Sequence, residues 1–411
     1  MLRAGLFLYD HLGGRKRLPP TRVLDLTRDE AGAPLKQGLF TTGFEYSDCA
    51  VDDARLVLLN ARDAADRGAV IRTRTKLVAG RRENGLWRVE VEDARSGARE
   101  TLSARRLVNA AGPWVADVLT QELGARSQAR VRLVQGSHIV VRKLYDHARC
   151  YIFQTGDGRI VFAIPWRDDF TLIGTTDRDY RGDPAAVCAT EEEVAYLCEA
   201  ASGYFARAVR REDVVWSYSG VRPLYDDGAS EARAATRDYV FELDETDGAP
   251  LLSIFGGKIT TYRRLALHAL EKLGIGDGKL GADWTAKAPL PGGDVSIDAF
   301  PAFLADLARR YPFLPAAETG RLGRAYGTLA HELLAGVSGP ADLGESFGAG
   351  LTEREVRWMI EKEWALTAED VLWRRSKLGL RMPAEGAARL SAWMTRHVGV
   401  ALPDTIRAGA A

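Results

Sequence analysis

Residues 107–114 read LVNAAGPW, and residues 255–262 read FGGKITTY. In both stretches a short apolar run meets glycine and then a segment that favours helix, which predicts a strand, a tight turn and a helix start. Such a turn leaves backbone N–H groups without helix partners, and glycine lets a ligand approach them closely. The second stretch adds Lys258 and two threonine hydroxyls. Packing alone would also explain either turn, so the pattern predicts β–α units and leaves a ligand site open.

The region around these turns predicts a mixed α/β domain. Between residues 131 and 245 several short apolar strands follow one another with turns between them, which indicates an antiparallel sheet that presents a face to a ligand. Residues 1–36 are rich in Arg, Gly and Pro, and we expect a loop-rich lead-in. Upstream of the first turn, apolar residues at helical spacing predict a helix over 52–67. Apolar and polar residues that alternate predict strands over 70–75, 77–81 and 86–92.

The sequence predicts a domain boundary between residues 276 and 296, where Gly and Pro cluster. Beyond this point every periodic segment predicts helix, as expected for an all-α domain. We therefore expect two domains, 1–280 and 281–411.

Composition excludes several classes of function. Lys plus Arg and Asp plus Glu both number 56, so no global basic field recruits nucleic acid. The four cysteines lack metal-ligand spacing and predict a reduced, cytosolic protein. No segment approaches the length of a transmembrane helix, so any membrane contact would be peripheral. His331-Glu332 lacks a second histidine at the spacing of zinc proteases, and we reject a metal site there.

Two single residues are further candidates. Arg222, in Ser217-Tyr-Ser-Gly-Val-Arg-Pro223, follows a glycine and suits the capture of a phosphate or carboxylate. His138, in Gly136-Ser-His138, lies within an apolar strand. A solvated arginine and a hydrogen-bonded core histidine are the alternatives, and neither residue alone decides the function.

Longer stretches resemble the FAD-dependent, quinone-linked sn-glycerol-3-phosphate dehydrogenases. They include GFEYSDCAVDDARLVL, LVNAAGPWV, GSHIVV, IPWRDDFTLIGTTDRDYRGDP, DVVWSYSGVRPLYDD and LLSIFGGKITTYRRLA. The resemblance runs from about residue 6 to about residue 393, and the combination of SGVRPL with FGGKITTYR is specific to this family.

The resemblance implies an α/β (α+β) fold, with a partial Rossmann-like FAD domain, an antiparallel substrate sheet and a helical C-terminal domain. It implies oxidation of glycerol 3-phosphate to dihydroxyacetone phosphate, with hydride transfer to FAD and electrons passed to a membrane quinone. The implied catalytic residues, among which the choice of base stays open, are Arg222, Lys258 and His138. The implied cofactor-binding residues are Val78 (or Leu77), Ala111, Gly112, Trp114, Gly257, Lys258, Ile259 and Thr260.

The family also begins with a strand, a GxGxxG turn and a helix that carry the FAD pyrophosphate. Here the pattern occurs only at residues 276–281, after a helix, and we interpret it as a chance match. We therefore expect an N-terminally incomplete chain that binds little FAD. Two alternatives remain open: a non-catalytic remnant that binds a phosphate or a partner, and a glycerol-3-phosphate oxidase that uses oxygen. The family further suggests a homodimer, peripheral on the cytoplasmic face of the membrane.

Overall fold

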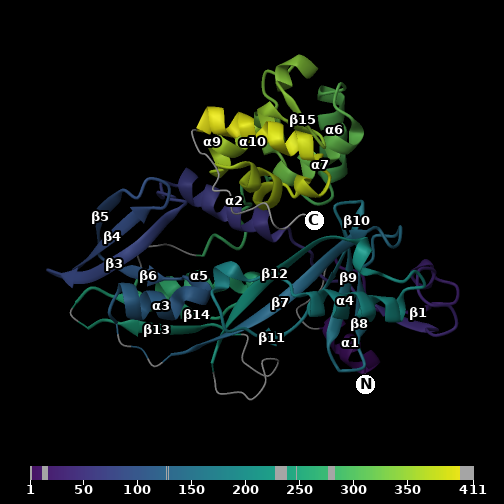
Figure 1. The fold of residues 1–411 in the computed structure, drawn as a ribbon, viewed down its shortest axis with the longest axis horizontal. Helices are drawn as coiled ribbons and strands as arrows, with labels where there is room; N and C mark the ends of the chain where they lie inside the picture. The colour runs from purple at the N-terminus through teal and green to yellow at the C-terminus, as the bar shows by residue number, and fades with distance from the viewer. Residues whose placement is uncertain are drawn as a thin grey trace. The chain divides into compact units, whose positions relative to one another are not determined.

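The computed structural model describes residues 2–11, 17–125, 127, 129–226, 238–246, 248–275 and 283–398. The chain forms two compact units, Met1–Ala50 with Thr75–Gly281, and Val51–Arg74 with Ala282–Ala411 (Figure 1). This division departs from the expected 1–280 and 281–411 in one place, because residues 51–74 belong to the second unit. The GxGxxG pattern at 276–281 lies outside the described residues.

The largest sheet of the first unit is antiparallel, as expected. Its strand order is β11-β7-β10-β9-β8, and β12 pairs with β7 along nearly its whole length. The strands are β7 (Val131–Arg142), β8 (Tyr151–Gln154), β9 (Ile160–Trp166), β10 (Phe170–Gly174), β11 (Arg178–Asp179) and β12 (Val214–Tyr225).

Helix α4 (Glu191–Tyr204) covers one face of this sheet. It begins at a capping box in which Thr190 and Glu193 satisfy each other's backbone N–H groups. Its apolar side chains pack against the odd-numbered residues of β7, such as Ile139 and Val141. Because strand side chains alternate between faces, the even-numbered residues of β7 point to the other side.

A second, smaller sheet joins both glycine turns. Strand β6 (Leu107–Asn109) runs parallel to β14 (Leu251–Phe255), which pairs antiparallel with β13 (Val240–Asp244). Beside it, β3 (Thr75–Glu83), β4 (Leu86–Asp93) and β5 (Arg99–Ala104) form a meander. Trp87, Val115, Leu251 and Phe255 are buried together between these elements.

Two local expectations were wrong. Residues 70–74 are not a strand, and the first strand of the meander begins only at Thr75. Val70 is 79% exposed, so this alternating segment lacks the neighbour that strand pairing requires. The lead-in over residues 1–36 also contains more structure than expected: helix α1 (Leu2–His11) and strand β1 (Arg22–Asp25), which pairs with β2 (Thr42–Glu45) beyond it.

The second unit is mainly helical, as expected. A core that includes Leu307, Tyr326, Met359 and Trp393 holds it together. Its helices are α2 (Asp53–Asp66), α6 (Phe300–Arg310), α7 (Ala316–Tyr326), α8 (Leu329–Leu333), α9 (Glu353–Glu363) and α10 (Ala384–Val398). A short hairpin of β15 (Ser346–Gly348) and β16 (Leu351–Thr352) accompanies them. Throughout the described part of the chain, no helix has the length and apolarity needed to cross a membrane.

Candidate functional site

The two glycine turns lie at one edge of the small sheet. Val108 of β6 is directly opposite Leu252 of β14 in a parallel pair, so both strands end at the same edge. Strand β6 continues into a 3₁₀ helix that begins at Gly112, where φ is +56° and the space that a Cβ would occupy is open. Strand β14 continues through Gly256 and Gly257, with φ of +71° and +98°. Carboxyl ends of neighbouring parallel strands are the usual ligand-binding edge of such sheets.

Asn109 fixes the shape of the first turn. The side chain is 4% exposed, and its amide nitrogen donates a 2.9 Å hydrogen bond to the carbonyl of Val115. Its amide oxygen accepts a 3.3 Å hydrogen bond from the backbone N–H of Ala111. Sequence reasoning did not single out this residue, although it stands inside the quoted stretch. A buried polar side chain that satisfies both ends of a turn makes the turn rigid.

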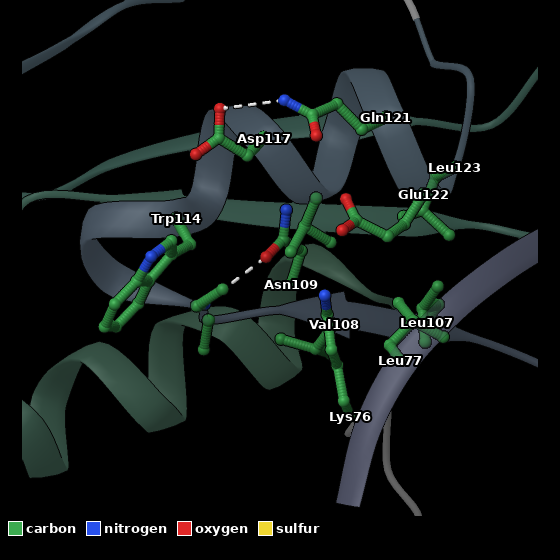
Figure 2. A pocket seen from close by; sticks show the side chains of 13 residues that line it. Lys76, Leu77, Leu107, Val108, Asn109, Trp114, Asp117, Gln121, Glu122 and Leu123 are labelled. Atoms are coloured by element: carbon green, nitrogen blue, oxygen red, sulfur yellow. Dashed lines mark hydrogen bonds between the residues drawn. The ribbon is translucent and has the colours of Figure 1, made fainter. Parts of the chain in front are cut away.

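A cavity of about 530 Å³ opens beside β6 (Figure 2). Trp114 lies at one end, Leu123 at the other and Asn109 between them. The size is typical of cavities that take small molecules and cofactors. Its wall consists of Lys76, Leu77, Leu107, Val108, Asn109, Ala110, Ala111, Trp114, Asp117, Val118, Gln121, Glu122 and Leu123.

The predicted cofactor residues divide between the cavity and the second turn. Ala111 and Trp114 line the cavity, whereas Val78 does not: it lies at a β-bulge of β3, next to Leu77, which does. Gly112 does not line the cavity either and begins the 3₁₀ helix after β6, whereas Gly257, Lys258, Ile259 and Thr260 form the turn after β14.

The second turn presents its cation to solvent. Lys258 is exposed, and among the described residues its ammonium makes no hydrogen bond or ion pair. The hydroxyl of Thr261 donates a 3.0 Å hydrogen bond to the carbonyl of Lys258. Helix α5 (Tyr262–Lys272) follows directly. The turn therefore offers an exposed cation and the N–H groups of a helix start to an incoming ligand.

Strand pairing brings His138 and Arg222 to one face of the large sheet. On β7 and β12, His138 is opposite Tyr218, Gly136 is opposite Gly220, and Arg222 is two residues further along. Directly opposite residues in an antiparallel pair share a face, and so do residues two apart. The face therefore has a histidine on one side, a glycine pair in the middle and an arginine on the other side.

Arg222 is held in one position although its side chain is 36% exposed. Its guanidinium donates hydrogen bonds to Asp177 Oδ1 at 2.7 Å and to Thr175 Oγ1 at 3.1 Å. The guanidinium lies over Gly136, since a Cβ added there would meet it at 2.5 Å. Asp177 and Thr175 belong to the loop after β10, within the GTTD sequence, and they were not among the predicted site residues.

His138 lies between an aromatic ring and a glycine. Its imidazole stacks on Tyr218 with ring centroids 5.0 Å apart and planes 6° apart. On another side the ring meets Gly174, where an added Cβ would be 2.1 Å from it. Between the histidine and the arginine, the position that a Cβ of Gly220 would take has no heavy atom of the described residues within 4 Å, apart from the glycine itself and its chain neighbours. A small ligand can therefore reach the backbone between a cation and an imidazole.

Lys258 belongs to the other sheet, and no described contact joins its ammonium to Arg222 or His138. The two sheets do meet nearby, because a Cβ at Gly256 would lie 3.7 Å from the backbone nitrogen of Tyr225, at the end of β12.

Comparison with known proteins finds a matching family for each of two long parts of the chain. Residues 5–263 match the FAD dependent oxidoreductase family, and residues 284–399 match the C-terminal domain of alpha-glycerophosphate oxidase. A glycerol-3-phosphate dehydrogenase of Pseudomonas aeruginosa is 51% identical over 96% of this chain and 76% of its own length. The chain belongs to the FAD-dependent glycerol-3-phosphate dehydrogenase family.

Within this family the substrate of a relative can differ. A D-erythritol 1-phosphate dehydrogenase of Brucella abortus is 49% identical over 96% of this chain and 78% of its own length. The glycerol-3-phosphate dehydrogenase of Bacillus halodurans, solved as a complex with FAD, is 27% identical, with a TM-score of 0.75 over 92% of this chain and 75% of that one. These findings confirm the family, the fold class and FAD as the cofactor that were predicted from the sequence.

Proposed function

We propose that this chain binds sn-glycerol 3-phosphate on the face between Arg222 and His138 and oxidises its C2 hydroxyl to the ketone of dihydroxyacetone phosphate. The proposal depends on one observation: the guanidinium of Arg222 is held by Asp177 and Thr175 and lies beside the open space at Gly220. A planar, oriented guanidinium matches two phosphate oxygens at once. The chain carries no net charge, so this local cation supplies the attraction for the anionic substrate.

The oxidation removes a hydride from C2 and a proton from its hydroxyl. When bound, FAD supplies the acceptor of the hydride. Of the three candidate bases, His138 fits best, because its imidazole lies on the same face as Arg222 and an unprotonated imidazole nitrogen can accept the hydroxyl proton. Lys258, from the neighbouring turn, then adds a second cation that favours loss of the hydroxyl proton.

The residues around the two turns suit a flavin. Backbone N–H groups at Gly112 and Gly257, with the hydroxyl of Thr260, would hold its polar edge, because neither glycine carries a side chain of its own and the space beside Gly112 is open. The cavity bounded by Ala111 and Trp114 would take the more distant half of the cofactor.

A second candidate substrate is D-erythritol 1-phosphate. The D-erythritol 1-phosphate dehydrogenase of Brucella abortus favours this substrate, because it is 49% identical to this chain, and the Pseudomonas aeruginosa glycerol-3-phosphate dehydrogenase is 51% identical. Both substrates present a phosphate and a secondary alcohol, so the same residues would act on either. Oxygen as the electron acceptor remains an alternative to quinone, because the C-terminal residues match a domain of alpha-glycerophosphate oxidase.

The remaining partners are proposed from the resemblance alone. We propose membrane quinone as the electron acceptor, and peripheral association of a dimer with the cytoplasmic face of the membrane. Flotation with liposomes and quinone reduction in them would test both proposals, and sedimentation would test the dimer.

The central experiment measures anaerobic dye reduction by the FAD-loaded chain with each of the two phosphates. Arg222→Ala should lower kcat/KM by about 10²–10³-fold, because a charge-assisted phosphate contact is lost. His138→Asn should act mainly on kcat. Arg211→Ala, which removes an exposed ion pair with Glu191, is the matched control and should retain full activity. A kcat/KM of Arg222→Ala within about threefold of wild type, or no dye reduction by flavin-loaded protein with either phosphate, would refute the proposal. Peroxide formation in air would identify an oxidase.

A further inference from the structure

Beneath the candidate site, on the side of β7 that faces α4, lies a group of buried polar side chains. Gln135, Ser137, Thr176 and Glu193 are all less than 7% exposed. An apolar core would be expected between a sheet and a helix, and a buried carboxylate there must be fully hydrogen-bonded to be tolerated.

Glu193 is the centre of this group. Its Oε1 accepts a 2.7 Å hydrogen bond from the hydroxyl of Thr176. Its Oε2 accepts hydrogen bonds from the side-chain amide of Gln135 at 2.9 Å and from the backbone N–H of Thr190 at 3.1 Å. One carboxylate therefore connects the start of α4, the central strand β7 and the loop that follows β10.

Thr176 carries this connection toward Arg222. Its hydroxyl donates to Glu193 and also accepts a 3.0 Å hydrogen bond from the backbone N–H of Ser137. The neighbours of Thr176 on either side, Thr175 and Asp177, are the residues that hold the guanidinium of Arg222. Without these hydrogen bonds, an arginine side chain that is 36% exposed would sample several positions. Its placement therefore depends on the loop after β10, which Glu193 holds through Thr176.

We infer that Glu193, acting through Thr176, is a positioning residue for Arg222 and thereby sets the affinity of the site for the substrate phosphate. The inference rests on the proposed function, since it needs Arg222 to bind that phosphate. Glu193 lies on the α4 side of β7 and contacts neither Gly220 nor His138, so its removal should affect phosphate binding more than the proton transfer.

The alternative is that Glu193 only caps α4. Thr176 separates the two roles, because Thr176→Val removes the hydroxyl while the capping box of Thr190 and Glu193 stays intact. Thr176→Ser keeps the hydroxyl and is the matched control.

The test measures the Kd of sn-glycerol 3-phosphate by calorimetry on the full chain, together with KM, kcat and the melting temperature. Thr176→Val should raise Kd and KM by about 10-fold or more and change kcat less than about threefold, since a misplaced binding group mainly weakens binding. Thr176→Ser should restore Kd to within about threefold of wild type. A lower melting temperature with unchanged Kd, or equal effects of valine and serine, would overturn the inference.

Two further variants complete the test. If Thr176→Val does not fold, Glu193→Gln, which preserves the volume of the side chain, carries the same expectation of a raised Kd, and an unchanged Kd would refute it. Arg222→Ala separates the two hypotheses. If this variant leaves Kd unchanged, the proposed function fails; if it raises Kd while the Thr176 and Glu193 variants do not, only the positioning role fails.

Discussion

Gly136→Ala tests whether the site depends on the position of a single guanidinium. A Cβ at this residue would meet Arg222 Nη2 at 2.5 Å, Nη1 at 2.7 Å and Cζ at 2.8 Å. Ordinary contact begins near 3.4 Å, so the guanidinium must move by about 1 Å and lose its alignment with Asp177 and Thr175. Misplacement of a positioned group by that amount costs about 10²-fold in kcat/KM, or ~2.7 kcal/mol of transition-state stabilisation.

The same substitution should leave the fold nearly intact. Arg222 is 36% exposed and can swing toward solvent, so the loss of its ion pair with Asp177 should reduce the free energy of unfolding by less than about 1 kcal/mol. Dye-reduction kinetics and thermal unfolding measure the two effects. Gly203→Ala, at an exposed position of α4 with open space around it, controls for the added methyl group and should be active and slightly more stable. Wild-type kcat/KM in Gly136→Ala would show that the guanidinium is not where binding occurs.

Three further predictions address stability and the cofactor edge. Asn109→Ala should lower the free energy of unfolding by about 1–3 kcal/mol and weaken FAD binding, because a buried carbonyl loses its donor; urea unfolding and flavin titration measure both, and an unchanged flavin affinity would contradict the role of this turn. Glu363→Ala should cost about 3–5 kcal/mol in thermal unfolding, because Arg55, 6% exposed, would keep a buried charge without its carboxylate; a loss below about 1 kcal/mol would mean that water reaches the arginine. The hydrogen bond from Arg357 lowers the pKa of Glu353, so the folded state gains stability above the ordinary value of 4.5 and loses it as pH falls through the lowered pKa. Melting temperatures of Glu353→Gln should therefore fall less steeply than wild type below pH 4.5, and parallel curves would refute this assignment.

The glycine turns were predictable from sequence because they depend on local chemistry. A strand, a glycine and a helix start occupy a few consecutive residues, and the structure has them where they were expected. The face of the large sheet was less accessible to sequence reasoning, because His138 and Arg222 come together only through the register of β7 with β12. The role of Asp177 was missed for the same reason: an aspartate in a loop shows its partner only after the strands have paired.

The position of α2 shows a second limit of prediction from the sequence. The amphipathic pattern of residues 52–67 predicted a helix correctly, but any apolar surface can accept such a face. The deciding contact is a buried ion pair between Arg55 and Glu363, residues 308 positions apart. In the sequence this arginine looks like one of many surface cations, and only burial makes it distinctive.

Gly256 also decides how the end of β14 meets the end of β12 within the first unit. At Gly256 a Cβ would approach the carbonyl oxygen of Asp238 to 2.8 Å and the backbone nitrogen of Tyr225 to 3.7 Å, and φ is +71°. The end of β14 therefore lies against the end of β12 without a side chain between them, and the rings of Phe255 and Tyr225 meet edge to face, 6.3 Å apart. Arg222 stands three residues before that contact and Lys258 two residues after it. The two cations thus come from different sheets, and backbone packing at Gly256 sets the distance between the two strand ends from which they extend. The proposed site would therefore offer a small anion one guanidinium held by hydrogen bonds and one exposed ammonium.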